Sequence, residues 1–170
     1  MRLYINRLGG ASILYQCLAA WILVLCFIPS ASHAEDRDQH SKGQTVYAPV
    51  YSHIYSGDRE QPIYLAVTLS IRNTDTQQAI TITKVDYYDS NGRMIKGYLD
   101  SPVTLNPLST TRYVIKESDK AGGSGANFIV SWQAERPVAT PLIETVMIST
   151  RQTLGISFTS RGRVIGPAAP

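Results

Sequence analysis

The stretch Leu65–Ile95, which reads LAVTLSIRNTDTQQAITITKVDYYDSNGRMI, determines the fold class of this 170-residue chain. Its first part has an apolar residue at every second position, namely Leu65, Val67, Leu69 and Ile71. Small or polar residues occupy the positions between them. A period of two residues is typical of a strand that turns one face to the core. The stretch therefore predicts β-structure.

A second strand is expected over residues 79–89, and its apolar residues change phase part-way along. The apolar residues up to Ile82 have one parity, and those from Val85 onward have the other. A β-bulge near Thr83–Lys84 inserts one residue and returns the apolar set to the core. The Asn-Gly pair at positions 91–92 then predicts a hairpin, since this pair is a strong signal for a tight turn between strands.

Short stretches of the same kind recur along the chain, separated by turn residues. We expect further strands at residues 45–51, 94–98, 103–105, 110–116, 127–135, 143–149 and 154–159. Pro49 makes the first of these an edge strand or a bulged strand, because proline lacks the backbone N–H. The other prolines of this region are expected between strands: Pro102, Pro107, Pro137 and Pro141.

The whole pattern predicts an all-β, immunoglobulin-like two-sheet sandwich of roughly seven to nine antiparallel strands. Trp132 lies on a predicted strand and is expected to anchor the core, as a buried tryptophan often does in sandwiches. The predicted core residues are Leu65, Val67, Leu69, Ile71, Ile80, Ile82, Phe128, Val130 and Trp132.

Residues 1–34 have the layout of a secretory signal peptide. Arg2 and Arg7 begin the segment, an uncharged and mostly apolar run follows over residues 13–28, and Ser32-His33-Ala34 offers small residues before Glu35. We therefore expect export to the periplasm or the extracellular space. The alternative is that the segment is kept as a membrane anchor. Both cysteines of the chain fall within it, so the mature protein is expected to hold no disulfide.

The remaining chain is expected to form one domain. Residues 35–43 are polar and predict a disordered lead-in, residues 44–165 predict the β-sandwich, and residues 166–170 predict a disordered tail. The chain has 16 basic and 13 acidic side chains, and two of the basic ones lie in the leader, so the remainder carries a net charge of +1. That charge argues against a nucleic-acid partner, because such binders are strongly basic.

Two resemblances follow from these residues. Leu65–Ile95 resembles the front half of the small immunoglobulin-like accessory domains of secreted bacterial proteins, and Leu105–Thr110 resembles their L-x-P-G-x-T turn with Leu108 in the glycine position. The run GQTVYAPVYSHIYSGD from Gly43, with LAVTLSIRNTD after it, is similar to DUF3124, a bacterial family of unknown function. The second resemblance implies a self-contained domain and no particular activity.

The densest polar and aromatic stretch lies just before the first clear strand, over residues 50–59. Its candidate ligand-binding residues are Tyr51, His53, Tyr55, Asp58 and Arg59. Alternate positions of a strand share a face, and aromatic side chains on one face suit stacking against a sugar ring or a peptide. The alternative is that the tyrosines only cover the sheet and that Ser-Gly-Asp at positions 56–58 is a simple turn. We expect no metal ion and no cofactor.

The function predicted from these features is a non-catalytic module of the bacterial envelope that binds a protein, a peptide or a glycan. An all-β scaffold without a catalytic grouping usually presents loops and sheet faces for binding. The alternatives are a hydrolase with an unrecognised site around His53 and Asp58, and a structural component of the envelope. After cleavage of the signal peptide, no stable membrane anchor is expected.

Overall fold

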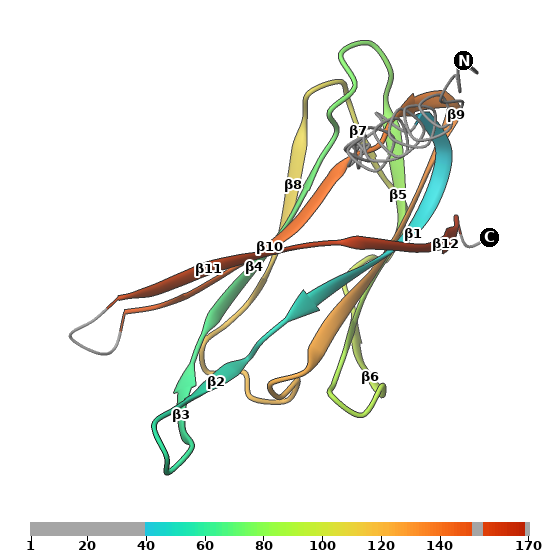
Figure 1. The fold of residues 1–170 in the computed structure, drawn as a ribbon. Helices are drawn as coiled ribbons and strands as arrows, with labels where there is room; N and C mark the ends of the chain where they lie inside the picture. The colour runs from blue at the N-terminus through green and yellow to red at the C-terminus, as the bar shows by residue number, and fades with distance from the viewer. Residues whose placement is uncertain (1–39, 151–154, 169–170) are drawn as a thin grey trace, which may run out of the picture. The chain divides into compact units, whose positions relative to one another are not determined.

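The computed structural model describes residues 40–150 and 155–168, and in these residues the chain forms antiparallel strands without a helix. Figure 1 shows the strands of the two main sheets, and their buried apolar side chains form one core. The predicted all-β sandwich is therefore confirmed. No helix in the described part of the chain is long and apolar enough to cross a membrane.

The larger sheet has six strands in the order β12-β1-β9-β5-β6, and β7 pairs with β5 beside β6. Its strands are β1 (His40–Val50), β5 (Ile80–Tyr88), β6 (Met94–Gly97), β7 (Val103–Leu105), β9 (Ala126–Ala139) and β12 (Arg163–Pro167). The central strand β9 separates β1 from β5, so segments that are distant in sequence lie side by side.

The smaller sheet has four strands in the order β11-β10-β4-β8. These are β4 (Ala66–Arg72), β8 (Thr110–Ile115), β10 (Leu142–Ser149) and β11 (Ile156–Arg161). A separate two-stranded hairpin consists of β2 (His53–Ser56) and β3 (Gln61–Tyr64). It connects β1 of the larger sheet to β4 of the smaller one.

The core contains every residue predicted for it. The four apolar residues of the first predicted strand are shielded from solvent, and so are the predicted core residues of β5 and β9, including Trp132. Burying such side chains stabilises a domain by about 25 cal/mol per Å² of apolar area. The phase change in β5 is also confirmed, because the register between β5 and β9 shifts between Ile82 and Lys84. Val85 and Tyr87 thereby stay buried with the apolar residues before the shift.

The predicted bounds of the domain are too narrow at both ends. Strand β1 begins at His40, inside the predicted lead-in, and β12 extends to Pro167, inside the predicted tail. Both segments are held by pairing: β1 pairs with β9 and β12. With β12 and the hairpin strands, the described residues form twelve strands, more than predicted. The predicted signal peptide lies outside the described residues.

The prediction that Pro137 lies between strands is wrong. Pro137 lies inside β9, where residues 134–137 have no partner in β1 because the register shifts between Ser41 and Gly43. Because Pro137 has no partner strand here, its missing N–H removes no hydrogen bond between β9 and β1. Of the two alternatives predicted for the strand that contains Pro49, the edge strand is confirmed, because β1 has no β12 partner beyond Tyr47. Pro49 lies in this part, where β1 pairs with β9 and not with β12.

A network of hydrogen bonds lies at the end of the sandwich where β4 ends. The Asn73 side-chain amide donates to the carbonyl oxygens of Gln78, Leu105 and Asn106 at 2.8–3.2 Å. The Asp75 carboxylate accepts from the backbone N–H groups of residues 77, 78 and 139. These bonds join the β4–β5 turn to the β7–β8 turn and to the end of β9.

The β7–β8 turn has the shape expected when glycine follows proline, although the residue is leucine. Ser109 donates its backbone N–H to the carbonyl oxygen of Asn106 at 3.0 Å, and Leu108 has a φ of 57°. Proline at the second position and positive φ at the third are the signature of a type II turn. Leu108 is 67% exposed, so its side chain contributes little packing while its Cβ is strained.

We expect Val67→Ala to lower the free energy of unfolding by about 1–3 kcal/mol, because the removed methyl groups leave space in a fully buried site. Thr68→Ala, at the next position of the same strand, should change it by less than about 0.5 kcal/mol. Urea denaturation followed by tryptophan fluorescence measures both. Equal losses for the two variants would contradict the assigned faces of β4.

We expect Leu108→Gly to raise the free energy of unfolding by about 0.5–1 kcal/mol. Removing the Cβ relieves the left-handed strain, which outweighs the extra freedom of glycine in the unfolded chain. Leu108→Ala is the matched control, because it removes the same exposed side chain and keeps the strained Cβ. Thermal unfolding compares them, and a gain in the alanine variant as large as in the glycine variant would refute the strain.

Candidate functional site

The β2–β3 hairpin projects beyond the end of β4, outside both sheets (Figure 1). Its strands pair in the register His53↔Tyr64 to Ser56↔Gln61. The turn includes Gly57 with a φ of 67° and Glu60 with a φ of 49°, and the Glu60 N–H donates to the Gly57 carbonyl oxygen at 3.0 Å. The Ser-Gly-Asp sequence was predicted to form a turn, and it does so at the tip of this hairpin.

The base of the hairpin is fixed to the core by Ser52, which is fully buried. Its carbonyl oxygen accepts from the N–H of Leu65 at 3.0 Å, and its own N–H donates to the carbonyl oxygen of Gly123 at 3.0 Å. Its hydroxyl shares a 3.0 Å hydrogen bond with the hydroxyl of Tyr87. Burial raises the pKa of Tyr87, against the opposing effect of the Ser52 hydrogen bond.

Three aromatic side chains gather on the hairpin, and we call His53, Tyr55 and Tyr64 the hairpin aromatic cluster. The ring centroids of His53 and Tyr55 are 5.0 Å apart, and those of His53 and Tyr64 are 5.9 Å apart, both edge to face. The Nε2 atom of His53 and the Tyr55 hydroxyl form a 3.1 Å hydrogen bond. Tyr55 is 55% exposed, so the cluster presents aromatic surface to solvent.

A cation from another loop completes the cluster. The ammonium group of Lys120 lies over the ring of Tyr64, 4.1 Å from its centroid. A cation in this position is attracted by the negative face of the ring. The site therefore combines two aromatic phenols, an imidazole and one ammonium group, and it draws them from the hairpin and from the β8–β9 loop.

Hydrogen bonds tie the β8–β9 loop, which carries Lys120, to Ser90 of the β5–β6 turn. The carbonyl oxygen of Gly122 accepts from both the N–H and the hydroxyl of Ser90, at 2.9 and 3.0 Å. Ser90 Oγ in turn accepts from the N–H of Gly125 at 2.9 Å. A Cβ at residue 122 would collide with the Tyr87 hydroxyl, so glycine is required by the close approach rather than by flexibility.

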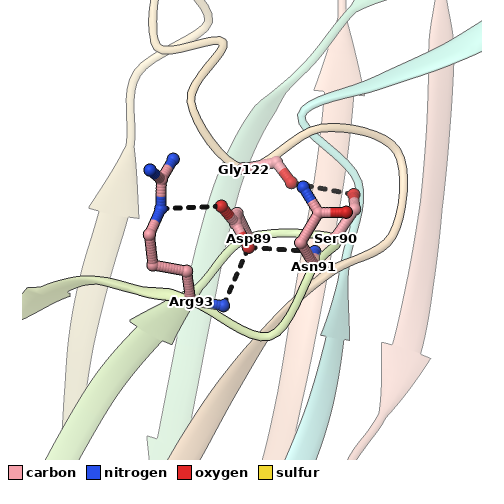
Figure 2. A network of polar contacts seen from close by, with 5 residues as sticks. All are labelled: Asp89, Ser90, Asn91, Arg93 and Gly122. Atoms are coloured by element: carbon pink, nitrogen blue, oxygen red, sulfur yellow. Dashed lines mark hydrogen bonds and ion pairs between the residues drawn. The ribbon is translucent and has the colours of Figure 1, made fainter.

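Figure 2 shows the turn on which this loop rests. The Asp89 carboxylate accepts from the N–H groups of Asn91 and Arg93, both at 2.9 Å, and pairs with the Arg93 guanidinium at 3.2 Å. Gly92 follows with a φ of 77°, and its N–H donates to the Asp89 carbonyl oxygen. This is a three-residue hairpin loop with glycine at its left-handed position, so the predicted hairpin is confirmed.

The structure brings together only part of the predicted site. His53 and Tyr55 are in contact, whereas Tyr51 packs edge to face against Phe158 of β11, with 5.8 Å between the ring centroids. The prediction that these three residues share one strand is wrong, because β1 ends at Val50 and Ser52 turns the chain toward Gly123. Asp58 and Arg59 lie exposed in the turn at the tip.

Two residues of the cluster were missed by the sequence analysis. Tyr64 lies opposite His53 in the hairpin register, and Lys120 is 56 positions further along the chain. Pairing outward from the Ser-Gly-Asp turn identifies Tyr64 as the partner of His53. No local signal identifies Lys120, because its position depends on the contacts of the β8–β9 loop.

The contacts of His53 are with the aromatic side chains of the hairpin. His53 contacts Tyr55 and Tyr64, and neither Asp58 nor a serine side chain is among its hydrogen-bonding partners in the described residues. The Nδ1 atom of His53 is buried and has no hydrogen-bond partner there. No group of three or more His, Cys, Asp or Glu side chains in the same residues is placed to hold a metal ion.

Comparison with known proteins identifies the family of this chain. The model of a protein family of unknown function, DUF3124, matches residues 43–165. The chain belongs to DUF3124. No curated protein matches this DUF3124 chain. A solved structure described as "Crystal Structure of Thermotoga maritima 1070" is similar to 74% of the DUF3124 chain and 97% of its own, with 10% identity and a TM-score of 0.44.

We expect the stability of this DUF3124 protein to fall on acidification partly through Asp89. The backbone N–H of Arg93, with further help from Asn91 and the Arg93 guanidinium, holds the pKa of Asp89 below its ordinary value of 3.8. A carboxyl with a lowered folded pKa stabilises the protein above its unfolded pKa, and this contribution is lost as the pH falls through the folded pKa.

Asp89→Asn should therefore lose stability at pH 7 and show a shallower decline between about pH 5 and about pH 2. Urea midpoints measured across this range test the expectation. Asp58→Asn, at the exposed tip of the hairpin, is the control and should keep the original slope. An unchanged slope in Asp89→Asn would show that the turn does not depend on the charge.

Proposed function

We propose that this protein is a non-catalytic binding module of the bacterial envelope, and that the hairpin aromatic cluster with Lys120 is its ligand-binding surface. The observation that supports the proposal is the exposed Tyr55 beside the half-buried His53 and Tyr64, on a hairpin that belongs to neither sheet. Residues that only complete a core do not need to project from it. Tyrosine also brings a large contact area at small entropic cost, which is why it is frequent in binding surfaces.

The chemistry of the surface suits a ligand with both flat apolar parts and polar groups. The Tyr55 ring is available for stacking, and its hydroxyl is positioned by the 3.1 Å bond to His53. Lys120 supplies a positive charge at the Tyr64 face of the cluster. Peptides and glycans both combine such groups, whereas nucleic acid calls for a more basic surface.

The envelope location rests on residues 1–34, whose order of charge, apolar run and small residues is that of a signal peptide. N-terminal sequencing of the protein recovered from the periplasmic or extracellular fraction should begin at or near Glu35. Recovery of the intact N-terminus in the membrane fraction would contradict export as a cleaved protein.

Peptide and glycan arrays probed with the protein test the binding surface. Tyr55→Ala should weaken binding of an array-positive ligand by at least about tenfold, because aromatic anchors commonly dominate binding energy. Met94→Ala is the matched control: Met94 is 50% exposed, much like Tyr55, but lies on β6. Equal affinity of Tyr55→Ala and the unmodified protein would exclude the cluster as the binding surface.

A further inference from the structure

The two strands of the hairpin each leave one edge without a partner strand. Within the described residues, β2 pairs only with β3, and β3 pairs only with β2. A strand edge of this kind presents backbone N–H and C=O groups that a further strand can satisfy. Which of these groups point outward depends on the alternation of hydrogen-bonded and non-hydrogen-bonded pairs in an antiparallel ladder.

Two features of β3 show which pairs of the β2–β3 ladder are hydrogen-bonded. The N–H of Leu65 donates to the carbonyl oxygen of Ser52, so the N–H groups of every second residue back along β3, Ile63 and Gln61, also face β2. Pro62 has no N–H, so its pairing with Tyr55 is of the non-hydrogen-bonded kind. Counting along the register, the His53↔Tyr64 pair is also non-hydrogen-bonded.

It follows that the backbone groups of His53 and Tyr55 point away from β3. Both residues have an N–H and a C=O, and no backbone hydrogen bond of either is found among the turn and loop contacts of the described residues. The opposite edge of the hairpin differs, because Pro62 removes one of its two outward N–H donors. Proline on an edge strand is a common protection against further pairing. The hairpin is thus protected on β3 and open on β2.

We infer that the free edge of β2 binds an extended peptide segment of a partner protein by adding it to the hairpin as a third strand. A row of alternating donors and acceptors is complementary to another extended backbone, and a sugar ring does not reproduce its spacing. The side chains of His53 and Tyr55 lie on one face beside this edge, where they contact every second residue of the added strand. This inference rests on the proposed function and names its ligand class.

The first test is amide hydrogen exchange measured by NMR on the full chain. The probe is a peptide selected from random dodecapeptides displayed on phage against the immobilised chain. In the free protein, the amides of His53 and Tyr55 should exchange fast and those of Ile54 and Ser56 slowly. Saturating peptide should slow the first two by at least about tenfold. Slowing confined to other residues would overturn the inference, and so would a selection that enriches no peptide.

A second test uses N-methylated versions of the selected peptide. Methylation of every second amide, in the register that faces β2, should weaken binding by at least about tenfold, and methylation of the intervening amides should leave it within about twofold. Tolerance of both patterns would overturn strand addition. Pro62→Ala is the protein control: it restores a donor on the β3 edge and should leave the affinity for the peptide unchanged.

The results also separate this inference from the proposed function. Binding of a glycan that is lost in Tyr55→Ala, together with no peptide binding, would overturn strand addition and leave the hairpin aromatic cluster as a binding surface. Peptide binding that protects His53 and Tyr55 supports both. If neither a peptide nor a glycan binds in a Tyr55-dependent way, both fail.

Discussion

The two sheets share one core, so the strands that line it have to present their apolar side chains inward. A slip of one residue exchanges the two faces of a strand, and this makes register the most tightly constrained feature of the molecule. Strand β5 meets the constraint with an extra residue between Ile82 and Lys84, which keeps Val85 and Tyr87 in the core.

The bulge in β5 also determines where the candidate site is built. It turns Tyr87 inward, and the Tyr87 hydroxyl then meets Ser52, the residue at which the chain leaves β1 and enters the hairpin. A two-stranded hairpin has little stability of its own in water. The β2–β3 hairpin therefore depends on its buried anchors, Ser52, Ile63 and Leu65. Because these three residues pack against the core, the exposed side chain of Tyr55 remains available for contacts with a ligand.

The C-terminal strands depend on a single close approach. Gly162 separates β11 of the smaller sheet from β12 of the larger one, and its N–H donates to the carbonyl oxygen of Ile143 at 2.8 Å. A Cβ at this position would lie 2.6 Å from Cγ1 of Val46, which is too close for any side chain. The crossing lets β12 pair with part of β1, so β12 becomes an edge strand of the larger sheet.

The sequence by itself determined the β-class, the core residues, the bulge in β5 and the hairpin after it, because a period of two residues and an Asn-Gly turn depend only on neighbours in the chain. It also identified His53 and Tyr55 as site candidates. Only the tertiary structure decided that Tyr64 and Lys120 join them, that Tyr51 packs elsewhere, and that the chain continues into β12. Those outcomes depend on contacts between distant segments, where burial and pairing outweigh local preference.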